Sequence, residues 1–142
     1  MPTSADHEAA RRTRAFARVI GPFLAVVAAV VAVRAPDLAD QLDSFAADPM
    51  WPWVLGALLF GLGLGIVAFH QYWHGLAAVL ISLFGWFPLL RGLGLLVAPG
   101  LITEAAQSAS GGPAVGAVRA GFGLLAACGL YLSYVGWRRQ RD

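Results

Sequence analysis

The chain has 142 residues, of which 58% are hydrophobic and 13% charged, and its mean hydropathy is +0.68. Soluble domains carry about a quarter charged residues, and a domain of this size buries only about two thirds of its surface. The excess of apolar surface therefore excludes an ordinary soluble protein and predicts contact with membrane lipids. A net charge of +2 and a single cysteine exclude a basic nucleic-acid-binding face and an internal disulfide.

Four apolar runs are each long enough to cross the hydrocarbon layer of a membrane as a helix. They cover about residues 16–35, 53–71, 76–98 and 115–137. The runs do not alternate apolar and polar residues, so membrane-spanning strands are not expected. We predict an all-α membrane protein, a four-transmembrane-helix bundle that forms one integral membrane domain over residues 1–142, with residues 1–14 as a tail.

The first apolar run follows four arginines, so a cleaved signal peptide is an alternative to a first spanning helix. The run is long for a signal peptide, and the candidate cleavage site, Val33-Arg34-Ala35-Pro36, contains a charge and is followed by proline. We therefore expect an uncleaved helix. Arginine distribution then predicts the orientation. The two tails and the start of the first run hold seven arginines, whereas only Arg34 and Arg119 lie toward the other side. Both the N- and the C-terminus should be cytoplasmic, in a bacterial inner (plasma) membrane.

Two segments that follow prolines have apolar residues at helical spacing. They contain Leu38, Leu42 and Phe45 after Pro36, and Leu101, Ile102 and Ala105 after Pro99. Both are predicted to be short periplasmic interfacial helices.

The spacing of several residues also suggests a repeat. Pro36 and Pro99 are 63 positions apart, and the pairs Gly65/Gly129 and Trp73/Trp137 are each 64 apart. These spacings suggest two tandem helical hairpins of the same orientation. The alternative is chance, because glycine, proline and tryptophan are common at helix ends.

Arg91 lies within the third apolar run, about 24 Å along a helix that begins near Gly75. A charge at that depth costs a few kcal/mol and normally faces protein, water or an opposite charge. One interpretation is a contact with a substrate or an anion. The other is snorkelling to the outer head groups, with pairing to Glu104 or a loop aspartate.

His70, at the end of the second run, and His74, just before the third, lie at the turn between the two spans. If the helix continued through them, the two imidazoles would stand one turn apart, a spacing that can hold a metal ion. No further ligand is evident nearby, so we predict no metal site and no cofactor. A polar interfacial turn is the alternative interpretation.

Small residues recur every four positions at Ala57, Gly61 and Gly65, and Gly56 and Gly63 are further small positions. This pattern favours close helix packing inside the bundle or between subunits, with a groove for a lipid or ligand as the alternative. Gly92 and Gly94 beside Arg91, and Gly121 in the fourth run, are predicted to pack in the same way.

Phe69-His70-Gln71-Tyr72-Trp73, followed by Gly85-Trp86, Arg91-Gly92 and Pro99, resembles a pattern in small four-span bacterial inner-membrane proteins of uncharacterised function. The resemblance covers about residues 55–100 and carries no activity. It implies roles for His70, Trp73, Trp86 and Arg91, which we take as candidate substrate or ion contacts.

No catalytic motif is evident, so an enzyme is not the favoured class. We expect an oligomeric scaffold or an accessory subunit of a membrane complex, with membrane lipids and further subunits or copies as partners and no nucleic acid. A small transporter or channel with Arg91 facing a solute path is an alternative. A quinone- or metal-binding subunit that uses His70 and His74 is a second.

Overall fold

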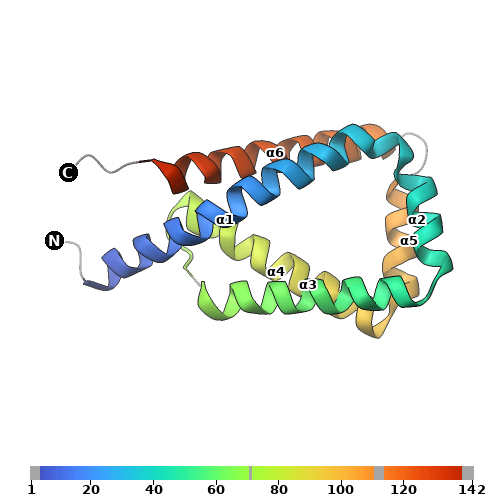
Figure 1. Cartoon of the computed structure of the whole chain (residues 1–142), viewed down its shortest axis with the longest axis horizontal. Helices are drawn as coiled ribbons and strands as arrows, with labels where there is room; N and C mark the ends of the chain where they lie inside the picture. Colours follow the sequence, from blue (N-terminus) through green and yellow to red (C-terminus); the bar gives the residue numbers. More distant parts are fainter. Residues whose placement is uncertain (1–3, 71, 111–113, 139–142) are drawn as a thin grey trace.

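The computed structural model describes residues 4–70, 72–110 and 114–138 (Figure 1). Gln71 of the sequence pattern, and the arginines at 139 and 141 used for the orientation, lie outside these residues. Within the described ranges the regular elements are all helical: α1 (Ser4–Arg34), a 3-10 turn (Ala35–Asp37), α2 (Leu38–Ala47), α3 (Met50–Phe69), α4 (Leu76–Val97), α5 (Pro99–Ser110) and α6 (Ala114–Trp137). The predicted all-α class is confirmed.

Four of the helices, α1, α3, α4 and α6, are long and apolar enough to cross a membrane. Large hydrophobic side chains remain exposed along all four, Val30, Leu58, Leu90 and Leu130 among them. Exposure of such surfaces to water is unfavourable, whereas their contact with lipid is not. The chain is a multi-pass membrane protein.

The spanning helices pack in two pairs, α1 with α6 and α3 with α4. The first span therefore pairs with the fourth and the second with the third, rather than each with its neighbour within a tandem hairpin. Figure 1 shows the two pairs as the long sides of a frame. The short helices α2 and α5 contact each other and lie across one end of it. We call the end of the frame that holds α2 and α5 the α2–α5 end. The opposite end, where α1 begins and α6 ends, is called the tail end.

The buried core lies where the four spanning helices come together, toward the tail end. Its fully or almost fully buried members are Ala17, Ile20, Ile66, Ile81 and Leu132. Toward the α2–α5 end the two pairs are separated by the short helices, which lie between them in space as well as in sequence. The two candidate sites described below lie at opposite ends of this frame.

Candidate functional site

His70 lies at the tail end and, with Ser82, is one of the two buried polar residues among the described residues. Helix α3 ends at Phe69, and His70 follows in an extended conformation, with its backbone N–H donating to the carbonyl of Ile66 at 2.8 Å. Its side chain is only 1% exposed. The connection then reaches Gly75, whose φ of 92° is a left-handed value that favours glycine, before α4 begins. The turn therefore directs His70 inward, toward α1 and α4.

Two hydroxyl groups contact the imidazole of His70. Thr13 Oγ1, on α1, lies 3.1 Å from Nε2, and Ser82 Oγ, on α4, lies 3.4 Å from Nδ1. The rings of Phe16 and Tyr72 meet the imidazole edge to face, with centroids 5.4 and 5.3 Å away. His70 thus joins the end of α3 to both helices that it faces.

Each of these hydroxyl groups already has a carbonyl acceptor. Thr13 donates to Ala9 O at 2.8 Å, and Ser82 donates to Tyr72 O at 3.0 Å. Burial lowers the pKa of His70, and a backbone hydrogen bond opposes that effect more weakly. A neutral imidazole has one N–H, so it can donate to one hydroxyl and accept from the other only if that hydroxyl releases its carbonyl. The cluster is therefore sensitive to the protonation of the ring.

His74 does not join His70. It is exposed and lines a cavity of about 560 Å³ beside Arg14, Tyr72 and Tyr131. The continuous helix that would have placed both imidazoles one turn apart is absent, because α3 ends before His70 and α4 begins after Gly75. Among the described residues no group of three or more His, Cys, Asp or Glu is arranged to hold a metal ion.

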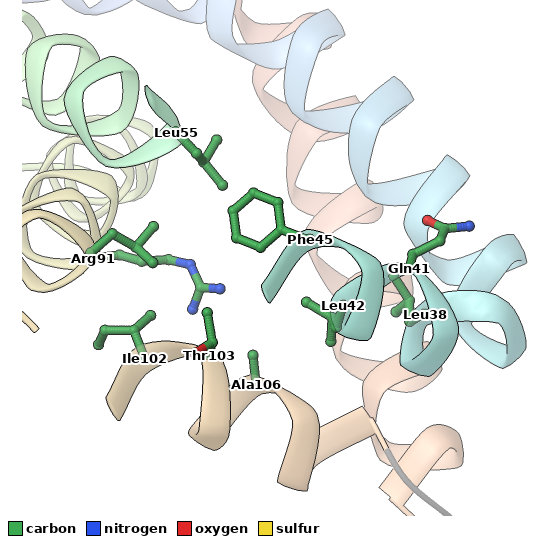
Figure 2. A pocket seen from close by; sticks show the side chains of 10 residues that line it. Leu38, Gln41, Leu42, Phe45, Leu55, Arg91, Ile102, Thr103 and Ala106 are labelled. Atoms are coloured by element: carbon green, nitrogen blue, oxygen red, sulfur yellow. The ribbon is translucent and has the colours of Figure 1, made fainter. Parts of the chain in front are cut away.

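Arg91 lies near the α2–α5 end and points into a cavity of about 240 Å³. Figure 2 shows its guanidinium group in the space enclosed by α2, α5 and the ends of α3 and α4. The apolar faces of both short helices, with Leu42 and Phe45 on α2 and Ile102 on α5, also line the cavity. The interfacial helices thus turn their apolar sides toward Arg91, although on α5 the inward residues are Ile102, Thr103 and Ala106 rather than Leu101 and Ala105.

No hydrogen bond or ion pair connects Arg91 to another residue of the described ranges. The expected pairing with Glu104 or a loop aspartate is therefore not formed. Asp43, a loop aspartate of the sequence analysis, accepts a hydrogen bond of 2.7 Å from Gln107 across the α2–α5 contact. Arg91 is half-buried, and no carboxylate of the described ranges balances its charge.

The glycines predicted to pack helices fall into two groups. A methyl group placed on Gly92 would overlap the backbone of Phe60 in α3, and one placed on Gly94 would press against Ile102 of α5. In contrast, Gly61, Gly65 and Gly121 have no non-local atom within 4 Å of the position of a Cβ. Ala57, on the same face as Gly61, is exposed. This face of α3 has no partner among the residues that the structure describes.

Besides Gly92, further glycines hold the pairs together; the sequence analysis includes Gly56 and Gly63 only as additional small positions and misses the others. In α3 they are Gly56 and Gly63, in α4 Gly85 joins Gly92, and in the first pair they are Gly21, Gly129 and Gly136. The signal was a spacing of seven, present in Gly56/Gly63, Gly85/Gly92 and Gly129/Gly136. Seven-residue spacing keeps one face toward a neighbouring helix over successive turns.

Trp73 and Trp86 are exposed and line neither candidate cavity. Their positions fit contact with the surroundings of the protein rather than with either site. No family model, curated protein or solved structure matches the chain. The resemblance based on Phe69-His70 and Arg91-Gly92 therefore stays a prediction, of which the four candidate spans are the confirmed part.

Proposed function

We propose that the protein is an assembly subunit of the membrane that binds a second copy or another membrane subunit through α3. The face formed by Ala57, Gly61 and Gly65 carries this proposal, since it is unpartnered within the chain. Glycine within a helix costs about 0.8–1 kcal/mol relative to alanine. At Gly56 and Gly63 the contact with α4 offsets that cost. At Gly61 and Gly65 no such contact is present among the described residues, and a helix from another chain would supply one.

Membrane helices associate through close packing rather than through the hydrophobic effect, and small residues spaced four apart permit that approach. The exposure of α6 extends the available surface, since only 11% of its apolar window is buried, against 28–33% for the other spans. Gly121 adds a further open position there.

The mass of the purified protein in detergent or nanodiscs tests this proposal, with any co-purifying chain identified. We expect a defined oligomer or complex that the double substitution G61L/G65L reduces to monomer. The substitution meets open space within the chain, so thermal unfolding of the monomer should change little. L62A, which alters an exposed side chain beside this face, is the control and should retain the wild-type mass. A monomeric wild type, or a double variant that still associates, would contradict the proposal.

Transport past Arg91 is a second candidate, because the residue does line a cavity between helices. Reconstitution in liposomes tests it, with solute flux that R91A alters. Absence of flux over a broad solute panel would remove this candidate.

We place the tail end on the cytoplasmic side of a bacterial inner membrane. The arginines Arg11, Arg12, Arg14 and Arg138 lie at this end, whereas Asp37, Asp40, Asp43 and Glu104 lie at the α2–α5 end. This distribution follows the positive-inside rule.

A further inference from the structure

The Arg91 cavity is enclosed on several sides by apolar groups. Leu55 of α3, Leu95 of α4 and Phe45 of α2 are among its walls, and Arg91 is its charged member. The other polar groups are Gln41 and Thr103. The Thr103 hydroxyl already lies 3.0 Å from the carbonyls of Pro99 and Gly100 in its own helix. A bound molecule would therefore meet one strong cationic donor in apolar surroundings.

The depth of Arg91 in the membrane indicates which surroundings its guanidinium group meets. Arg91 lies six residues before Val97, the last residue of α4, which places it about 9 Å from the helix end. Because α4 has 22 residues, this places Arg91 in the outer part of the hydrocarbon layer, short of the head groups that its long side chain can reach by snorkelling. An unpaired guanidinium at this level is unfavourable unless an anion or water reaches it. Because no carboxylate of the described residues pairs with Arg91, an anion from outside the chain can supply the counter-charge.

We propose that the Arg91 cavity binds the phosphate of an anionic phospholipid, with an acyl chain leaving along Leu55 and Leu95. The planar guanidinium can form paired hydrogen bonds to two phosphate oxygens. A volume of about 240 Å³ holds a head group but not a complete two-chain lipid, so the chains extend into the bilayer. A free phosphate ion would lose hydration against the apolar walls without a compensating contact. A lipid also carries acyl chains that can pack against those walls.

Native mass spectrometry of the purified protein with added phosphatidylglycerol tests this assignment. We expect one retained lipid per chain, and R91Q should weaken its binding roughly tenfold or more, as expected for lost charge-assisted hydrogen bonds. R119Q removes the same charge from an exposed position of α6 outside the cavity and should leave binding unchanged. R91K keeps the charge without the planar fork and should fall between R91Q and the wild type.

Two competitors identify the source of the phosphate. Millimolar inorganic phosphate and uncharged diacylglycerol should each fail to displace phosphatidylglycerol. Displacement by inorganic phosphate would overturn the lipid assignment in favour of a soluble anion. Equal losses in R91Q and R119Q would overturn it in favour of general surface attraction. Should R91Q fail to fold, L42W, which fills the cavity from α2, must still reduce lipid binding, and unchanged binding in L42W would overturn the proposal.

Discussion

The imidazole of His70 connects three helices through neutral groups, so its charge state matters to the fold. Burial lowers its pKa in the folded protein, whereas the pKa of an unfolded histidine is about 6.5. As the pH falls below that value, the unfolded chain binds the proton before the folded chain does. Stability from the neutral ring is thus complete above about pH 6.5 and is lost on acidification.

We expect the unfolding temperature in detergent to fall more steeply between about pH 7 and pH 5 in the wild type than in H70Q. At neutral pH, H70Q should lower the free energy of unfolding by about 1–2 kcal/mol, because its amide replaces the contacts with Thr13 and Ser82 imperfectly. H74Q is the matched control, since His74 is exposed, and it should keep the wild-type pH dependence. Parallel pH curves for H70Q and the wild type would show that His70 has no such role.

The sequence identified His70 and Arg91 as unusual but could not predict their partners. The apolar run ends at Phe69, but neither glycine nor proline follows until Gly75 to show that the helix itself stops there. Thr13 and Ser82 are distant in sequence and common residue types, so their contact with His70 appears only in three dimensions. Likewise, the sequence does not show that Asp43 accepts a hydrogen bond from Gln107 and forms no ion pair with Arg91.

At the scale of the helix, glycines that look equivalent in the sequence lie in opposite environments. Gly63 approaches the backbone of Leu89, whereas Gly65, two residues later, faces open space. Lipid-facing and helix-facing surfaces are both apolar in a membrane, so hydrophobic periodicity does not separate them as it does in a soluble helix. Span positions could therefore be predicted from length and hydropathy, but the packing face could not.

Leucine substitutions at these two glycines test the difference. G63L forces a large side chain into the α3–α4 contact and should lower the free energy of unfolding by at least about 2 kcal/mol, or prevent folding. G65L should leave the stability of the monomer nearly unchanged. Denaturant unfolding of the two variants in the same detergent compares them directly, and similar losses would contradict the observed pairing face.

At the scale of the whole molecule, the contacts repeat between the two halves of the chain. The core residues Ala17 and Ile81 are 64 positions apart, and Ile66 and Leu132, their counterparts in the partner helices, are 66 apart. When the first half of the chain is matched to the second, α1 corresponds to α4 and α3 to α6. The α1–α6 pair then corresponds to the α4–α3 pair. Asp43 and Gln107, which bond to each other where α2 meets α5, are also 64 apart.

The predicted repeat spacing of 64 holds for α1 and α4 but differs by two residues for α3 and α6. Gly129 packs on Ala25 as Gly63 packs on Leu89, so Gly63 rather than Gly65 is its counterpart. The helix pairs also combine one span from each half. Sequence spacing alone could suggest the repeat, but it could not show that the halves exchange partners, because hairpins of adjacent spans have the same spacing.

This exchange predicts that neither half of the chain is stable alone. If the chain is divided in the connection after Trp73, α1 and α3 in the first fragment lose their partners α6 and α4 in the second. We expect fragments 1–73 and 74–142 to be degraded when expressed separately and to co-purify when expressed together. G63L in the first fragment should abolish co-purification, because its contact, Leu89, lies in the second, whereas G65L should preserve it. Two independently stable fragments that do not associate would instead indicate hairpins of adjacent spans.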